Sequence, residues 1–423
     1  MSESTSTTAR ETQIRAEVRA WLEDNWDPNL SLHEWRNRLI DSGWGCASWP
    51  EQWYGKGLSV GLGAVVDDEI RQFGAVSVAK AGVRMLAAAT ILEHGSDLHK
   101  EKFLRPLLTG EDTWCQLFSE PGSGSDLAGL TTRADFDGEH WVINGQKVWT
   151  TSAHHAQYGM LLARTNWDVP KHQGMTYFLI EMEQPGVEVR PLKQMNGHAS
   201  FNEIFFTDAK IAPEFMVSTE GNGWKVAMTT LAHERRLADG IRSWARGEKG
   251  SGRVFDELRA EIATVMEPYK WYPQRAGRVD LLLERAKATG RINDPVVRQA
   301  IAEVLIKAKA AEWTGRRVKA AHALGRPPGP EGSLGKLAGS QVARLAAHAH
   351  TLIAGGEAML AGDDGAMNGL ISEILVSVPA ESIAGGTDEI QRNIISERSL
   401  GMPKEARTDI DRPFRDVPRN TVS

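Results

Sequence analysis

The stretch with the most evident chemical potential is residues 119–126, which read Ser-Glu-Pro-Gly-Ser-Gly-Ser-Asp. Its glycines, Gly122 and Gly124, allow the backbone to approach a ligand closely and to adopt positive φ angles. The serines add hydroxyl groups, and exposed amides in such a turn can bind an anion. A polar surface turn is the alternative interpretation, and the octet alone would favour it.

A second motif follows further along the chain, at residues 137–153. There Trp149 and Thr151 come at the end of a run that contains an Asn-Gly turn signal between two strand-like stretches. An indole beside a hydroxyl suits a planar aromatic cofactor, because the ring offers stacking area and the hydroxyl one hydrogen bond. Together the two motifs indicate a site for a flat cofactor.

The elements that must position these motifs change character along the chain. Residues 1–110 show helical patterns and no convincing alternation with a period of two, which predicts an N-terminal all-α domain over residues 1–113. Residues 114–220 contain short apolar or alternating runs of strand length, which predict a β domain. Helical patterns return over residues 221–405, and residues 406–423 are polar and interrupted by proline, which predicts an extended or loose tail. The predicted fold class is α+β.

Bulk properties exclude several classes of protein. A chain of 423 residues with 41% hydrophobic and 25% charged residues predicts a globular protein of two or three domains. The net charge of -6 argues against nucleic acid as a partner. Two cysteines favour a reducing compartment, no signal-like start or apolar run long enough to span a membrane is present, and we expect a cytoplasmic protein. His154 and His155 lack partners at metal-binding spacing, so we predict no metal.

Three segments of the chain resemble the acyl-CoA dehydrogenase family, in the family's order and at its spacing. They are residues 119–134, 144–153 and 385–403. The resemblance covers most of the chain and is weakest at residues 246–290. It implies N-terminal helices, a middle antiparallel β-barrel domain and a C-terminal four-helix bundle.

The resemblance also implies FAD as the cofactor and indicates how it is held. Ser119 would bond the pyrimidine edge of the isoalloxazine, and Ser125 would lie near the pyrophosphate or the thioester arm of the substrate. Trp149 would lie near the dimethylbenzene side and Thr151 near flavin N5. The full set of implied FAD contacts is Gln116, Phe118, Ser119, Gly124, Ser125, Trp149, Thr151, Gly355, Gly356, Thr387 and Glu389.

The last four of these residues belong to a different part of the implied site. Thr387 and Glu389 would contact the adenine half of FAD, and Gly355 with Gly356 would mark where a neighbouring subunit approaches it. The family's Arg-x-x-Phe-Gly motif, which reaches the FAD pyrophosphate across the dimer, is not visible. Arg285 or Arg291 could substitute for its arginine.

The implied reaction removes a proton from the α-carbon of an acyl-CoA thioester and a hydride from its β-carbon, giving a trans-2-enoyl-CoA. Hydride goes to flavin N5, and the enolate oxygen needs preorganised hydrogen-bond donors. The base must be a carboxylate in an apolar, water-poor place that raises its pKa. Many members of the family carry this glutamate directly before a Gly-Thr pair, where this chain has Gly385. Gly385 can offer its amide to the enolate but cannot take a proton.

A second place for the base exists in isovaleryl- and long-chain-type members, in a Glu-Arg dipeptide on an earlier helix. This chain has Glu234 and Arg235 there, so we predict Glu234 as the base and Arg235 as a neighbour on the substrate side. The alternative is a solvated helix face with ordinary charge pairs. Glu381 is a weaker candidate for the base.

The expected activity is thus that of an FAD-dependent acyl-CoA dehydrogenase in fatty acid or lipid catabolism, such as β-oxidation, with an electron-transfer flavoprotein as acceptor. The expected assembly is a homodimer, a homotetramer or an α2β2 heterotetramer. The first alternative is an FAD-binding but catalytically incomplete subunit of a heteromeric enzyme. The second is a related flavin oxidase or monooxygenase that uses oxygen.

Overall fold

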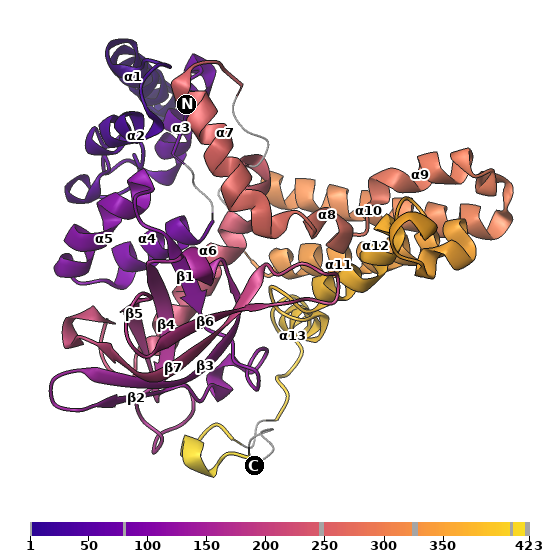
Figure 1. The fold of residues 1–423 in the computed structure, drawn as a ribbon. Coiled ribbons are helices and arrows are strands. Elements are labelled where there is room, and N and C mark those ends of the chain that lie inside the picture. The colour runs from indigo at the N-terminus through magenta and orange to yellow at the C-terminus, as the bar shows by residue number, and fades with distance from the viewer. Residues whose placement is uncertain (1, 79–81, 245–248, 324–328, 407–408, 419–423) are drawn as a thin grey trace. The chain divides into compact units, whose positions relative to one another are not determined.

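The computed structural model divides into two compact units by their contacts (Figure 1). It describes residues 2–78, 82–244, 249–323, 329–406 and 409–418. Unit 1 comprises Met1–Leu192, Phe201–Glu267 and Asp409–Ser423. Unit 2 comprises Lys193–Ser200 and Pro268–Thr408.

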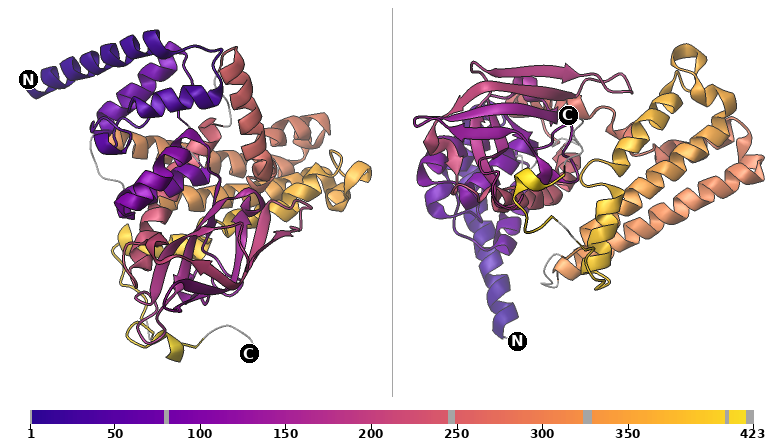
Figure 2. Two further views of the ribbon diagram at one scale, coloured as in Figure 1. Left: turned by 60° about the vertical axis from the view of Figure 1, so that its left-hand side comes forward. Right: turned by 90° about the horizontal axis from the view of Figure 1, so that it is seen from below.

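The first part of unit 1 is helical, as predicted (Figure 2). Ile14, Val18 and Leu22 lie on the expected inward face of the first helix and are buried. The second helix begins at a capping box in which Ser31 and Glu34 bond each other's backbone. The helices are α1 (Ser2–Asn25), α2 (Leu32–Asp41), α3 (Val60–Phe73), α4 (Gly82–His94) and α5 (Asp97–Thr109).

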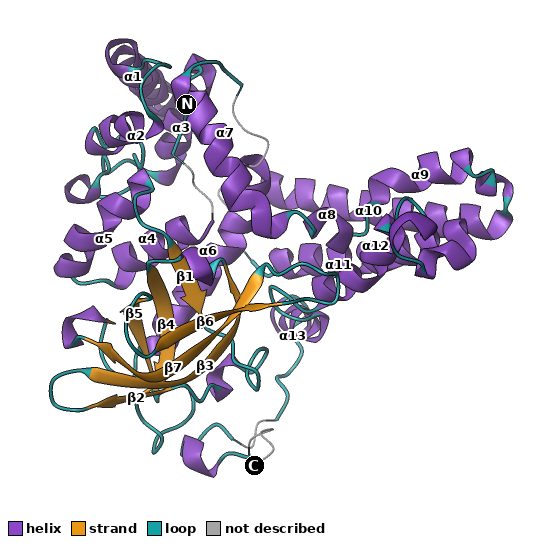
Figure 3. Ribbon diagram, in the orientation of Figure 1, coloured by secondary structure: helices purple, strands orange, loops and turns teal. Residues whose placement is uncertain are grey.

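The strands gather in one eight-stranded sheet with the order β6-β7-β3-β2-β4-β5-β8, and β1 pairs with β4 (Figure 3). Most pairings are antiparallel, as predicted, but β1 and β2 both run parallel to β4. The strands are β1 (Trp114–Leu117), β2 (Arg133–Phe136), β3 (Trp141–Thr151), β4 (Tyr158–Arg164), β5 (Met175–Glu181), β6 (Val187–Leu192), β7 (Phe201–Ile211) and β8 (Met216–Val217). Residues 175–180 of β5 are all buried, which is why they form an uninterrupted apolar run in the sequence.

Two more helices, α6 (Gly223–Trp244) and α7 (Arg253–Met266), belong to unit 1. Helix α6 packs against α4 and β5. At this contact the buried hydroxyl of Thr230 lies 3.1 Å from that of Thr90 and 3.2 Å from that of Tyr177. The predicted domain boundaries near residues 113, 220 and 405 remain predictions.

Unit 2 is helical and its core lies between α9, α10 and α11, around Leu282, Val304 and Ile353. The predicted N-cap Asp294 accepts a hydrogen bond from the amide of Val296 at 2.9 Å. The helices are α8 (Tyr272–Arg275), α9 (Val279–Ala288), α10 (Pro295–Ala323), α11 (Glu331–Ala354), α12 (Leu370–Ser377) and α13 (Asp388–Arg398). None of the described helices is long and apolar enough to cross a bilayer.

The tail differs from the expectation of a loose arm where the structure describes it, over residues 409–418. Phe414 is 1% exposed, and its amide donates to the carbonyl of Val169 at 2.9 Å. This segment is part of unit 1. A single aromatic residue in a polar stretch gave no periodicity from which its burial could be predicted.

Candidate functional site

The octet at residues 119–126 forms a tight turn directly after β1. The backbones of Glu120 and Ser123 bond each other in both directions at 3.0 Å. Gly124 and Ser125 beyond them are exposed, and a Cβ placed at Gly124 would meet no atom within 4 Å. In the part of the chain that the structure describes, the amides of these two residues donate to no protein group. The turn therefore presents open backbone donors, as an anion-binding site requires.

A buried ion pair lies beneath this turn and holds it. The carboxylate of Glu120 accepts from the amides of Thr131 and Thr132 at 2.7 and 2.8 Å and from the ammonium of Lys147 at 2.9 Å. Lys147 also donates to the carbonyl of Phe118 at 2.9 Å. The turn, the start of β2 and the middle of β3 are thereby joined at one buried point.

Burial dominates the pKa of one partner of this pair, and charge with hydrogen bonding dominates the pKa of the other. Burial lowers the pKa of Lys147 more than the charge of Glu120 raises it. Burial also acts to raise the pKa of Glu120, but the charge of Lys147 and the hydrogen bonds of Thr131 and Thr132 outweigh it and lower that pKa to about 2. The hydrogen bonds from the Thr131 and Thr132 amides and from Lys147 stabilise the charged form of the Glu120 carboxylate directly. The carboxylate of Glu120 is therefore charged at neutral pH.

Two of the implied FAD contacts, Phe118 and Ser119, directly follow β1. Phe118 is buried, its ring lies 5.8 Å from that of Tyr177, and its carbonyl is bound by Lys147. Ser119 is half-buried, and its carbonyl accepts from the amide of Val148 at 2.9 Å. The implied contacts of Phe118 and Ser119 with FAD remain predictions, and for Phe118 both ring and carbonyl are already used inside the protein.

Trp149 stands at an irregularity in β3. The register with β7 shifts between Lys147 and Thr150, and Trp149 has φ 63°, a conformation uncommon for a bulky residue. Its side chain is 56% exposed and its ring meets that of Phe201 edge-on at 5.7 Å. Thr151 follows at the half-buried end of the strand. An exposed indole held in a strained conformation is typical of a binding site.

Glu234 lies on helix α6 in the same unit. Val226 and Thr230, earlier on this helix, are fully buried, and Glu234 follows Thr230 by one helical turn on the same face. It is half-buried, and Nε2 of Gln116 on β1 donates to its Oε2 at 3.4 Å. The carboxylate therefore lies beside the strand that leads into the octet, on the packed face of the helix. The side chain of Arg235 lies outside the described residues.

The Gly-Gly-Thr segment in unit 2 is also a turn with open backbone. Gly385 and Gly386 both have positive φ, at 67° and 88°, and their carbonyls both accept from Nε2 of Gln391 at 3.2 Å. A Cβ at Gly385 would meet nothing within 4 Å. Its amide donates to no protein group among the residues that the structure describes.

Helix α13 begins directly after this turn. Thr387 is its N-cap and accepts from the amide of Ile390 at 3.3 Å. Asp388 is buried and accepts from Ser340 at 2.6 Å and pairs with Arg344 at 3.0 Å. Glu389 is exposed. Gly355 and Gly356, at the end of α11, are exposed as well, so their implied role at a subunit contact remains a prediction.

The other charged candidates have partners inside unit 2. Glu381 forms a hydrogen-bonded ion pair with Arg275, which makes it a poor base. Arg285 donates to Nδ1 of His350 at 3.2 Å. Arg291 donates to the carbonyl of Leu352 at 3.1 Å. The replacement of the family's arginine by Arg285 or Arg291 remains a prediction.

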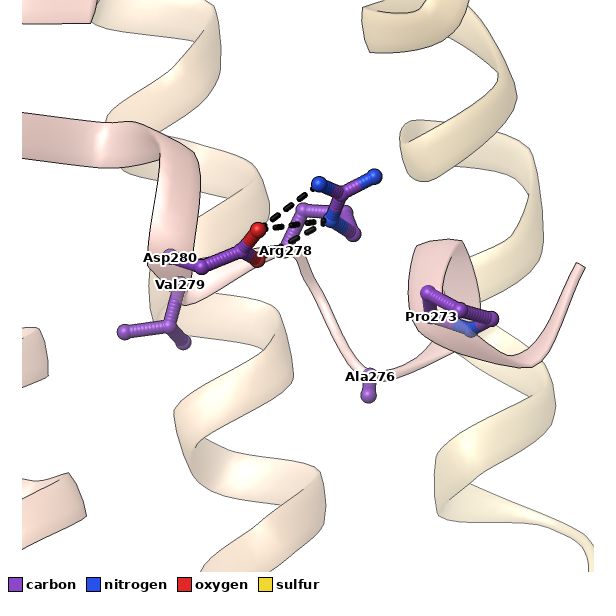
Figure 4. A pocket seen from close by; sticks show the side chains of 5 residues that line it. All are labelled: Pro273, Ala276, Arg278, Val279 and Asp280. Atoms are coloured by element: carbon purple, nitrogen blue, oxygen red, sulfur yellow. Dashed lines mark hydrogen bonds and ion pairs between the residues drawn. The ribbon is translucent and has the colours of Figure 1, made fainter. Parts of the chain in front are cut away.

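A hollow of about 560 Å³ beside α8 and α9 contains none of the predicted site residues (Figure 4). Arg278 at its wall donates to Asp280 at 2.7 and 2.9 Å, so its charge is neutralised. No group of three or more His, Cys, Asp or Glu side chains in the described ranges could hold a metal ion.

The residues present fit a flat cofactor that carries phosphate. Unit 1 carries an exposed indole at Trp149 and open amides at Gly124 and Ser125, and the buried ion pair of Glu120 and Lys147 lies beneath the turn that holds these amides. The sequence predicted Trp149, Gly124 and Ser125 as site residues but not the buried Glu120 and Lys147. The available signal was a lysine at an inward position of a predicted strand, which needs a buried counter-charge.

Comparison with known proteins agrees with these features. Sequence models described as the N-terminal, middle and C-terminal domains of acyl-CoA dehydrogenase match residues 8–111, 115–209 and 276–400. Acyl-CoA dehydrogenase IpdE1 of Mycobacterium tuberculosis is 32% identical over 421 residues, covering 93% of this chain and 98% of the relative.

Solved structures show the same fold. The Tcur3481-Tcur3483 steroid ACAD has a TM-score of 0.62 and 23% identity, covering 94% of this chain and 98% of that one. The ChsE4-ChsE5 complex from Mycobacterium tuberculosis has a TM-score of 0.57 and 24% identity, with 94% and 98% covered. The predicted three-domain α+β fold is confirmed, and the chain belongs to the acyl-CoA dehydrogenase family of FAD-dependent oxidoreductases.

Proposed function

We propose that this protein converts an acyl-CoA thioester to its trans-2-enoyl-CoA, with Glu234 as the base that removes the α-proton. The observation that carries the proposal is the place of Glu234. It lies on the packed face of α6 and accepts a hydrogen bond from Gln116, which leads into the octet. The alternative of a freely solvated helix face does not account for either feature.

Several residues of unit 1 have separate roles in the proposed reaction. Gln116 orients the carboxylate of Glu234 through its side-chain amide. The amides of Gly124 and Ser125 bind polar groups of the cofactor or the thioester arm, and Trp149 covers a flat ring. FAD, when bound, accepts the hydride from the β-carbon. Arg235 as a substrate contact remains part of the proposal.

The direct test is the colour of the purified protein. We expect it to carry FAD, and we expect the flavin absorbance to bleach when an acyl-CoA is added without oxygen. A panel of straight, branched and polycyclic acyl groups would identify the substrate. If FAD is bound but no thioester in the panel bleaches it, this chain alone does not perform the dehydrogenation.

A second candidate function is that of a half-active subunit in a heteromeric enzyme, and Gly385 favours it. The Gly-Gly-Thr turn has no carboxylate where many members of the family have one. A solved structure similar in fold to this chain is a complex named ChsE4-ChsE5. A protein that is colourless alone and yellow after co-expression with a second subunit would support this function over the first.

The acceptor and the assembly are also part of the proposal. We infer an electron-transfer flavoprotein in the cytoplasm as the acceptor, and assembly through α10, where Ile306 is 67% and Trp313 57% exposed. Turnover with that acceptor under anaerobic conditions, compared with turnover under oxygen, would separate a dehydrogenase from a flavin oxidase or monooxygenase. Light scattering of an Ile306→Lys variant would test the α10 face.

A further inference from the structure

The described tail, residues 409–418, contacts a segment of unit 1 that also holds the octet turn. We propose that Phe414 and Asp409 are positioning residues that strap this turn into its cofactor-binding conformation. The inference rests on the proposed function, because it takes the octet turn to be the place where FAD is held. The contacts that carry it all lie within unit 1.

Phe414 is the central contact of the strap. Its ring is 1% exposed, and the guanidinium of Arg164 lies 3.4 Å from its centroid. The ring of Trp167 lies 5.4 Å away. Backbone bonds from Phe414 to Val169 at 2.9 Å and from Arg415 to Trp167 at 3.0 Å tie the segment to the loop between β4 and β5. Phe414 thus closes one face of a fully buried guanidinium.

Arg164 connects Phe414 to the short turn that follows the octet. Its guanidinium donates to the carbonyl of Ala128 at 2.7 Å and to that of Leu130 at 3.1 Å. Both carbonyls belong to buried residues of the short turn that follows the octet. An arginine that is 0% exposed keeps this geometry only while its surroundings exclude water. The ring of Phe414 is one of those surroundings.

Lys171 makes a second, independent connection. Its ammonium lies 2.7 Å from a carboxylate oxygen of Asp409 in the tail and 3.1 Å from one of Asp126, the last residue of the octet. Asp126 directly precedes the short turn at residues 127–129, whereas the carbonyls held by Arg164 lie within this turn and directly after it. The tail therefore connects to the start of this turn through charge and to its middle and end through an aromatic ring and Arg164.

The geometry explains why a polar tail carries one buried aromatic residue. If the tail served only to cover surface, it would need no charge bridge to Asp126 and no ring on Arg164. Because one connection ends at Asp126 in the octet and the other at the turn that directly follows it, we expect loss of the tail contacts to act on cofactor affinity before it acts on the rest of the unit. An arginine–ring contact of this kind is consistent with an affinity change of about tenfold.

The test uses full-length apoprotein titrated with FAD. Phe414→Ala is expected to raise the Kd for FAD about tenfold and to speed amide hydrogen exchange over residues 119–130. Phe414→Tyr keeps the ring and should restore both. Asp409→Asn, which removes the weaker connection, should raise the Kd by about threefold.

Phe255→Ala is the matched control, because this ring is 3% exposed and packs against Trp26 among the N-terminal helices. It should lower the melting temperature and leave the Kd for FAD within about twofold. Equal Kd values and equal exchange over residues 119–130 in Phe414→Ala and Phe255→Ala would overturn the strap. If the wild-type protein binds no FAD, the proposed function fails, while the exchange over residues 119–130 still tests the strap.

Discussion

Two glycine-containing turns of this protein are built in different ways. The octet turn of unit 1 rests on the buried Glu120–Lys147 pair and on the amides of Thr131 and Thr132. The Gly385–Gly386 turn of unit 2 has two positive φ angles and is held by the side-chain amide of Gln391. One turn is fixed by several mutually dependent bonds and the other by backbone conformation. In the proposed function the first turn places the cofactor rigidly, and the second turn has open space and no carboxylate at Gly385.

The largest effect should follow from breaking the ion pair under the octet. Glu120→Gln keeps the shape but leaves the ammonium of Lys147 buried without a counter-charge, so unfolding of unit 1 should require about 3–5 kcal/mol less. Urea unfolding measures this loss. The double variant Glu120→Gln with Lys147→Met should recover much of it. A loss below about 1 kcal/mol in the single variant would show that the turn does not depend on the pair.

As the pH falls, unit 2 should lose stability before unit 1 does. Burial lowers the pKa of His350, which is fully buried on α11, from 6.5 to about 4. The unfolded chain binds this proton first, so His350 stabilises the fold above pH 6.5 and that stability is lost as the pH falls toward 4. The loss in unit 2 should approach about 3 kcal/mol, whereas Glu120 begins to fail only below pH 4.5.

Amide exchange measured separately in each unit between pH 6.5 and 4 would check this order. In a His350→Gln variant the pH dependence of unit 2 over that range should flatten. Loss of protection in the octet before loss in α11 would contradict the assignment.

A matched pair of alanine substitutions should distinguish the two turns directly. Gly385→Ala places a side chain at φ 67°, so we expect a loss of about 1 kcal/mol although the space is open. Gly124→Ala meets no atom and has no such strain, so its stability should change little. FAD titration should show the reverse order, with Gly124→Ala weakening binding more. Equal effects on both measurements would contradict the roles given to the turns.

The smallest effect should come from Gln391→Leu. This substitution removes the side-chain amide that donates hydrogen bonds to both carbonyls of the Gly385–Gly386 turn. The carbonyls can then bond water instead. We expect a loss of about 1 kcal/mol or less and no change in FAD bound to unit 1. Thermal unfolding with a flavin absorbance readout measures both quantities. A loss as large as that of Glu120→Gln would remove the contrast between the turns.

Much of this arrangement could be predicted from local sequence. The helical face of Ile14, Val18 and Leu22 and the apolar run of β5 follow from periodicity. The octet and Trp149 carry unusual combinations of glycine, serine and indole that local chemistry explains. The identity of the cofactor followed from the family resemblance, because periodicity carries no information about cofactors.

What could not be predicted depends on pairings between distant residues. Nothing near Glu120 in the sequence indicates that Lys147 would neutralise it, and the buried ring of Phe414 meets Arg164 from the far end of the chain. The parallel pairing of β1 with β4 likewise has no local signal. Such contacts arise from the topology of the sheet, and a single sequence does not display them.

The central claim is that Glu234 is the base, and anaerobic stopped-flow reduction of the bound flavin by an acyl-CoA tests it most directly. Glu234→Gln should leave the FAD content and absorbance unchanged and slow reduction by about a thousandfold or more. Glu93→Gln, at an exposed carboxylate on α4, is the matched control and should reduce at the wild-type rate. A Glu234→Gln protein that binds FAD and is reduced at nearly the wild-type rate would contradict the account.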